Sequence, residues 1–221
     1  MKTKRLATAL FLVATTEFLS PLVQSACGQT FWTDGTGDWN AAANWSLGVP
    51  NAGSGTAFDA VIENGGTAQL AALPAGSVRR LRLGRAAGAG NLLVDAATLS
   101  VTGDLYLNEN GVAASSLTVR DGSTVTTPTT SVGQSSAAAS NFTVSGTATT
   151  YSATTQFILG NAGAGTASLT VDTGAQLTSA SSIIGNSAGS IGVATVTGPG
   201  STWSSTSTLT VGGSGMGTLN I

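Results

Sequence analysis

The segment from Phe157 to Ser179 decides the fold, and it reads FILGNAGAGTASLTVDTGAQLTS. Apolar and polar residues alternate at residues 167–171 and 176–178, and residues 157–159 form a third, wholly apolar run. Such alternation places successive side chains on opposite faces of an extended chain. Gly, Asn and Asp separate the runs, and these residues favour turns. The segment therefore predicts three short strands joined by bends.

The same pattern recurs along the chain at a nearly constant interval. Triplets such as Leu-Thr-Val end at residues 94, 119, 144, 171, 196 and 221, with steps of 25, 25, 27, 25 and 25. A second series, an apolar residue followed by Gly or Asn, ends at residues 84, 108, 133, 160, 185 and 212. A period of this size is typical of a stacked supersecondary unit. We predict an all-β chain, a parallel β-helix (solenoid) with about six coils of 24–27 residues.

Glycine-rich breaks separate the predicted strands. A left-handed backbone costs glycine little, so glycine is typical of tight bends. We predict that bends contain Gly163, Gly165, Gly189, Gly192, Gly213, Gly215 and Gly217. A flexible glycine-rich linker is the alternative, but regularly spaced Leu-Thr-Val triplets are not typical of linkers.

Charged residues make up only 8% of the chain, and histidine is absent. From Gly122 onward, Asp172 is the only charged side chain. A histidine-dependent nucleophilic triad has no base here, and a zinc site has no His and no second Cys. We therefore predict that the protein is not an enzyme and has no catalytic residues, no metal and no cofactor. Ser and Thr are expected to cover most of the surface.

The N-terminus has the pattern of an export signal. Lys2, Lys4 and Arg5 precede a largely apolar stretch at residues 6–16, whose eleven residues are too few to span a bilayer. Small residues around Ala26 favour cleavage there, so residues 1–26 are predicted to be a signal peptide. The lone cysteine, Cys27, follows directly, and its lipidation is an alternative to an unmodified junction. We expect export through the inner membrane, to the cell surface, the outer membrane or the medium.

Residues 27–75 depart from the repeat and contain Trp32, Trp39 and Trp45. The end of a solenoid exposes unpaired strand edges and core residues, so it needs a cap. Large aromatic residues are suited to that role because each buries much apolar area. We predict an aromatic cap, with the first coil strands at residues 61–62 and 68–70. A platform that stacks on carbohydrate is the alternative.

Arg79, Arg80, Arg82 and Arg85 form the only basic cluster, within the repeats predicted for residues 76–221. Alternation in this run points Arg80 and Arg82 outward. A basic patch could bind sulfated glycans or anionic lipopolysaccharide, whereas a solvated strand face is the simpler interpretation. Nucleic-acid binding is not expected, because acidic residues outnumber basic ones by 10 to 8.

Carboxylates are also few. Glycoside hydrolysis needs two neighbouring acids, and the coils offer only Asp95, Asp104, Glu109 and Asp121 for such a pair. Their proximity to glycine and to predicted bends favours turn formation instead. The run from Asp34 to Asp38 resembles a calcium-binding loop faintly, but it is a single copy without a terminal Glu, and a turn explains it equally well.

Two segments resemble bacterial autotransporter passenger domains. One begins with the tryptophans at residues 32–45 and continues to residues 58–70, and the other is Gly-Pro-Gly-Ser-Thr-Trp at residues 198–203, followed by Leu-Thr-Val-Gly at 209–212. The resemblance covers most of residues 30–221. It implies a right-handed parallel β-helix, passage through a C-terminal outer-membrane barrel of the same polypeptide, and display at the cell surface, often as an adhesin. The sequence stops in mid-coil at Ile221 without that barrel, so we expect a truncated piece of a longer protein, and a related secreted repeat protein that is anchored otherwise is the alternative.

Together these features predict an exported cell-surface β-solenoid that acts as an adhesive or structural display element. Its expected partners are a host-cell or matrix surface, with glycans among its ligands, and the barrel of its own full-length polypeptide. A β-helical polysaccharide-degrading enzyme is the leading alternative. A non-binding spacer or biofilm-matrix protein is the other.

Overall fold

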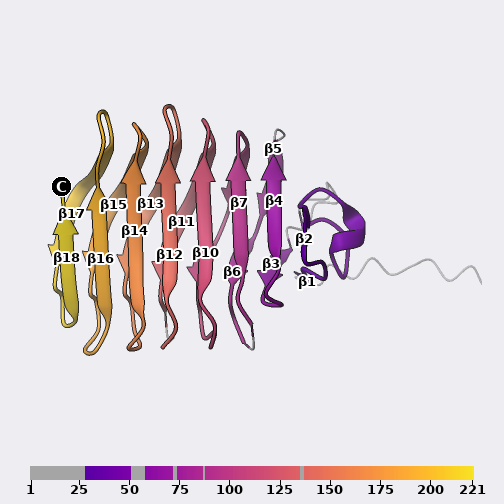
Figure 1. Ribbon diagram of the computed structural model, residues 1–221, viewed down its shortest axis with the longest axis horizontal. Coiled ribbons are helices and arrows are strands. Elements are labelled where there is room, and N and C mark those ends of the chain that lie inside the picture. Colours follow the sequence, from indigo (N-terminus) through magenta and orange to yellow (C-terminus); the bar gives the residue numbers. More distant parts are fainter. Residues whose placement is uncertain (1–27, 51–57, 72–73, 87, 135–136) are drawn as a thin grey trace, which may run out of the picture.

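The computed structural model describes residues 28–50, 58–71, 74–86, 88–134 and 137–221. They form an elongated β-solenoid of about six turns, with the N-terminal cap at one end and the C-terminus at the other (Figure 1). Within these ranges the only helix is the short 3-10 segment η1 (Ala42–Asn44). The all-β solenoid predicted from the repeat is therefore confirmed.

Two sheets run along the solenoid, and neighbouring strands pair in parallel. The eight-stranded sheet contains, in spatial order, β18 (Met216–Asn220), β16 (Ile191–Val196), β14 (Thr166–Asp172), β12 (Ser140–Ser145), β10 (Ser115–Arg120), β7 (Asn91–Asp95), β4 (Thr67–Ala71) and β2 (Thr36–Asp38). The ten-stranded sheet follows β1 (Gln29–Phe31), β3 (Asp59–Ile62), β6 (Arg80–Leu83), β9 (Asp104–Leu107), β11 (Thr124–Val132), β13 (Thr150–Leu159), β15 (Gln176–Ile184) and β17 (Thr202–Val211), with β5 (Pro74–Val78) and β8 (Thr98–Val101) beside this path.

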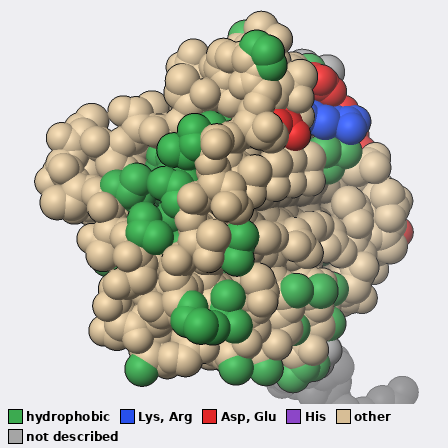
Figure 2. Space-filling view, turned by 60° about the vertical axis from the view of Figure 1, so that its left-hand side comes forward, with side chains coloured by type: hydrophobic (Ala, Val, Ile, Leu, Met, Phe, Trp, Pro, Cys, Tyr) green, Lys and Arg blue, Asp and Glu red, His purple; other side chains and the backbone are tan. Residues whose placement is uncertain are grey.

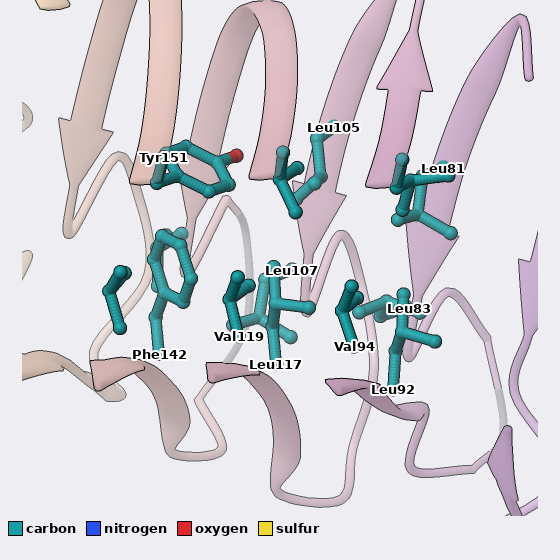
Figure 3. Packing of buried hydrophobic residues seen from close by; sticks show 14 of the residues in the cluster. Leu81, Leu83, Leu92, Val94, Leu105, Leu107, Leu117, Val119, Phe142 and Tyr151 are labelled. Atoms are coloured by element: carbon teal, nitrogen blue, oxygen red, sulfur yellow. The ribbon is translucent and has the colours of Figure 1, made fainter. Parts of the chain in front are cut away.

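The two sequence series are two buried columns of the interior. In the eight-stranded sheet the first column is Val94, Val119, Val144, Val171 and Val196. In the ten-stranded sheet the second is Leu83, Leu107, Val132, Leu159 and Ile184. Figure 3 shows Val94 and Val119 of one sheet meeting Leu83 and Leu107 of the other inside the coil. The predicted stacking of successive turns is confirmed.

The coil has fewer separate strands than the sequence predicts. The predicted third strand, residues 176–178, is the beginning of β15, which continues to Ile184. A register shift between Ser179 and Ser181 interrupts the pairing of β15 with β17, so a β-bulge replaces the third turn. Nearer the N-terminus, β8 and β9 are separate strands divided at Thr102 and Gly103. The same corner thus changes from a turn to a bulge along the solenoid.

Hydroxyl groups occupy the interior at this bulged corner. The Oγ atoms of Ser179 and Ser182 are 2.6 Å apart, and Ser205 Oγ of the next coil lies 2.8 Å from Ser182 Oγ. In an earlier coil Thr130 Oγ1 lies 2.6 Å from the hydroxyl of the buried Tyr151. Burying hydroxyls is tolerated here because they hydrogen-bond to one another.

A left-handed backbone conformation explains why Gly or Asn ends each pair of the second series. These residues, Gly84, Asn108, Gly133, Gly160, Gly185 and Gly212, all have φ between 61° and 73°. Two of the predicted bend glycines lie in strands instead, Gly192 in β16 and Gly217 in β18. A Cβ at Gly192 would collide with the carbonyl oxygen of Leu159, and one at Gly217 with the amide nitrogen of Gly212. Close approach of neighbouring backbone, rather than a bend, requires glycine at these two positions.

The N-terminal end is closed by the three tryptophans. Trp45 packs edge to face against Trp32 and Trp39, with ring centroids 5.1 and 4.8 Å apart. Trp45 Nε1 also donates a hydrogen bond to the Trp39 carbonyl oxygen at 2.7 Å. All three side chains are buried, with at most 4% of their surface exposed. The aromatic cap is confirmed, and these rings leave no free face on which a sugar could stack.

The cap is continuous with the solenoid, because β1 pairs with β3 and β2 pairs with β4. The predicted first coil strands, residues 61–62 and 68–70, lie within β3 and β4, and the predicted boundary at residues 75 and 76 falls inside β5. The predicted signal peptide, residues 1–26, and Cys27 lie outside the described residues. In the described part of the chain, no helix has the length and apolar character needed to cross a membrane.

Candidate interaction surface

The clustered arginines lie on and beside β6, in the ten-stranded sheet. Leu81 and Leu83 are buried whereas Arg80 and Arg82 are partly exposed, so the predicted alternation is confirmed. Asp59 on β3 is only 1% exposed and pairs in register with Arg80.

The Asp59 carboxylate is held by two of these arginines. Arg79 Nε donates a hydrogen bond to Asp59 Oδ1 at 2.8 Å, and Arg82 Nε lies 4.0 Å from Asp59 Oδ2. A buried carboxylate needs such partners, because an uncompensated charge away from water is costly. Arg79 and Arg82 therefore have a structural role that the sequence does not reveal.

Two more carboxylates neutralise the cluster. Arg82 Nη1 lies 3.1 Å from Glu109 Oε2, and Arg85 Nε lies 3.5 Å from Glu63 Oε2. Arg85 Nη1 also donates to Gln29 Oε1 at 3.0 Å. Three of the four predicted arginines are thus in ion pairs, and their charge is largely compensated within the protein. Binding of an anionic ligand at this patch stays a prediction.

Tyr106 lies on β9 in register with Arg82, on the same outward column. Arg82 Cζ is 5.7 Å from the centroid of the Tyr106 ring, within the range of a cation–π contact. The Tyr106 hydroxyl donates to Asp104 Oδ2 at 2.9 Å. Burial, followed by this hydrogen bond, raises the pKa of Tyr106, while the positive charge of nearby Arg80 lowers it. Arg80 itself forms no ion pair or side-chain hydrogen bond with the residues that the structure describes.

The carboxylates considered for catalysis all have partners. Asp104 binds Tyr106, and Glu109 binds Arg82. Arg120 brings the other two together, with Nη2 at 2.7 Å from Asp95 Oδ2 and Nε at 3.2 Å from Asp121 Oδ2. The structure therefore joins Asp95 to Asp121 through a cation, an arrangement that stabilises adjacent coils.

The Asp34–Asp38 run forms a bend at Asp34 and Gly35, continues as strand β2 (Thr36–Asp38) and is followed by a turn at Trp39 and Asn40. Asp34 Oδ1 accepts a hydrogen bond from the Gly35 amide at 2.7 Å, and Asp38 Oδ1 accepts one from the Asn40 amide at 2.9 Å. Across the ranges that the structure describes, no group of three or more His, Cys, Asp or Glu side chains is placed to hold a metal ion. The local hydrogen bonds agree with the turn interpretation at the two ends of the run, whereas its middle is part of β2.

Uncharged polar residues form columns on the outside of the coils. In the eight-stranded sheet, Thr118, Thr143, Thr170 and Thr195 occupy matched positions on successive strands. In the other sheet, Thr150 Oγ1 donates to Thr124 Oγ1 of the preceding coil at 3.2 Å. Figure 2 shows a face with little charge, on which hydrophobic side chains gather toward the C-terminal end.

Sequence reasoning missed two parts of this surface. Tyr106 could have been found from the period, since it follows Arg82 by 24 residues, the first step of the second series. Asp59 precedes its register partner Arg80 by only 21 residues, so the period does not identify this pairing. Comparison with protein-family models, curated protein sequences and solved structures gave no match to this chain.

Proposed function

We propose that this chain is exported and works at the cell surface as an adhesive or structural display element, the passenger part of an autotransporter. The resemblance of residues 30–221 to passenger domains supports this proposal. The stacked coils support it independently, because a solenoid presents extended surfaces along its length.

The observation that carries the proposal is the register of the outward threonines. Thr118, Thr143, Thr170 and Thr195 repeat one polar group from coil to coil at the spacing of paired strands, about 4.8 Å. A partner that meets such a column makes many equivalent weak contacts, and their combined strength rises with the number of coils. Binding through repeated contacts needs no single deep pocket.

Surface display is tested first, on the native full-length protein in its own cells. An epitope tag inserted in the exposed turn at Gly189, where an added Cβ would meet no atom within 4 Å, should be detected by antibody on intact cells and removed by external protease. The gene should continue past codon 221 into the outer-membrane barrel that the resemblance implies. A tag that is detected only after lysis would contradict the proposal, as would a gene without such an extension.

Adhesion is tested by removing one whole turn. Deleting residues 145–171 joins Val144 to Asp172, and because Val144 and Val171 are register partners the remaining coils keep their pairing. A surface that adheres through many equivalent contacts should lose part of its adhesion to host cells or matrix, and deletion of residues 76–221 should abolish it. Unchanged adhesion after the larger deletion would support a non-binding spacer instead.

A further inference from the structure

We propose that the outer face around Tyr106 binds a neutral, hydroxyl-rich glycan, with Arg80 and Asp104 as its hydrogen-bonding groups. This inference rests on the proposed surface function and names the class of ligand. It replaces the sulfated glycan that the arginine cluster suggests in the sequence.

Adjacent strands bring the three side chains together. Asp104 and Tyr106 lie two residues apart on β9, so both point outward, and β9 pairs directly with β6, which carries Arg80. A Cβ added to Gly103 would lie 3.3 Å from Arg80 Cγ, which places the stem of Arg80 against the backbone of the residue before Asp104.

The chemistry of the three groups suits a sugar. Tyr106 is partly exposed, with the Arg82 guanidinium over one side of its ring. The rest of the ring, with its polar edge, matches the C–H face and hydroxyl edge of a pyranose. Arg80 supplies donors in a planar fork, and Asp104 Oδ1 is an acceptor, since the Tyr106 hydroxyl occupies only Oδ2. Neighbouring hydroxyls of one sugar could bind Arg80 and Asp104 together.

Charge favours a neutral ligand over an anionic one. The cluster contains four arginines, Arg79, Arg80, Arg82 and Arg85, and four carboxylates, Asp59, Glu63, Asp104 and Glu109. The formal charges cancel, so the face has no net positive charge to attract a sulfated chain. Asp104, next to the bound sugar, would repel sulfate groups.

The test measures binding of the purified chain to two immobilised sets of probes. One set contains neutral oligosaccharides of glucose, galactose and mannose, and the other contains sulfated oligosaccharides of equal length. We expect binding to at least one neutral probe, with less than about a twofold change between low and high salt, because screening acts on charged partners. Tyr106→Ala and Arg80→Ala should each weaken this binding by about tenfold.

Two further variants separate the site from the fold. Arg120→Ala removes an exposed arginine of β10, in the other sheet, and should leave glycan binding unchanged. Tyr106→Phe keeps the ring but not the hydrogen bond to Asp104, so it should retain most of the affinity. Circular dichroism melts of every variant show whether the fold is kept.

Three results would overturn the proposal: no binding to any neutral probe, binding to sulfated probes alone with steep salt dependence, or full binding by folded Tyr106→Ala. None of these results bears on display of the epitope-tagged protein on intact cells. Failure of the glycan site and failure of the proposed function are therefore distinguishable.

Discussion

The two ends of the solenoid contain similar side chains in opposite surroundings. At the N-terminal end, Trp39 is 0% exposed within the cap. In the last coil, Trp203 is only partly buried, and Leu209 and Val211 are 43% and 45% exposed. Trp203 and Leu209 nevertheless occupy inward columns, as their register with β15 shows. Figure 2 shows the resulting hydrophobic area toward the C-terminal end.

This difference shows that equivalent residues of one inward column do not contribute equally to the free energy of unfolding. Leu169 lies between Phe142 and Ala194 in its column and is 1% exposed, whereas Leu219 has Ala194 on one side only and is partly exposed. In a repeat protein each coil is completed by its neighbours. The contribution of a residue to stability therefore depends on how many of its neighbouring coils are present.

The largest loss of stability is expected when Asp replaces a leucine of one inward column. The loss should be larger at an interior coil than at the last coil. Leu169→Asp should destabilise the protein by more than about 4 kcal/mol, because it buries a carboxylate without a partner. Leu219→Asp, in the last coil, should cost only about 1–2 kcal/mol. Thr170→Asp, on the outer face, is the control and should change stability by no more than about 0.5 kcal/mol. Denaturant melts followed by circular dichroism measure all three, and equal losses would contradict the assigned facing.

Removing the two tryptophans compares the ends directly. Trp39→Ala should cost about 3–5 kcal/mol, since it empties a buried site in the cap. Trp203→Ala should cost about 1 kcal/mol, because its ring is already partly in water. The same melts give both values, and a larger loss for Trp203 would mean that the cap is not the better-packed end.

A substitution of Asp59 tests the ion pairs near the N-terminal cap. Asp59→Ala should destabilise by about 2 kcal/mol, because Arg79 and Arg82 lose the carboxylate that they share. Asp172→Ala, which removes the only acid of the later coils, should stay within about 0.5 kcal/mol. Thermal melts of the two variants make the comparison. Similar stabilities would assign the Asp59 cluster no structural role.

A substitution in the last coil, at the C-terminal end, is expected to have the smallest effect on stability. It should nevertheless change the self-association of the chain. The unpaired edge of β17 and its exposed apolar residues should make the 221-residue chain associate as its concentration rises. Leu209→Lys should suppress this association while changing stability by no more than about 1 kcal/mol. Sedimentation velocity over a range of concentrations measures it, with Thr118→Lys, on an interior coil, as the control. If the Leu209→Lys variant still associates, the contact between chains lies elsewhere on the surface.

The fold could be predicted because the residues that define it are local and repeated. Val119, Val144, Val171 and Val196 are spaced by one coil length, so the sequence alone indicates that they stack. The bulge near Ser179 could not be predicted, because a bulge and a turn both interrupt alternation in the same way. Gly192 looked like a bend residue, and only the neighbouring Leu159 backbone explains why it is glycine.

The candidate surface was predicted only in part, for a different reason. Arg80 and Arg82 were placed correctly on the outer face by alternation within one strand. The partners of Arg82, Asp59 and Glu109, come from other coils, and ion pairing depends on side-chain reach as well as on register. From the sequence alone, the run of arginines predicts a positively charged surface. In the structure, the carboxylates of Asp59 and Glu109 compensate the positive charge of Arg82.

The constant register between coils has a consequence for how such a protein can change over generations. Since Val144 and Val171 occupy equivalent places, recombination between them would add or remove one coil and keep the register of the remaining strands. Genes for this architecture can therefore grow or shrink in whole units by unequal crossing-over. The length of the solenoid would then vary in discrete increments of about 4.8 Å.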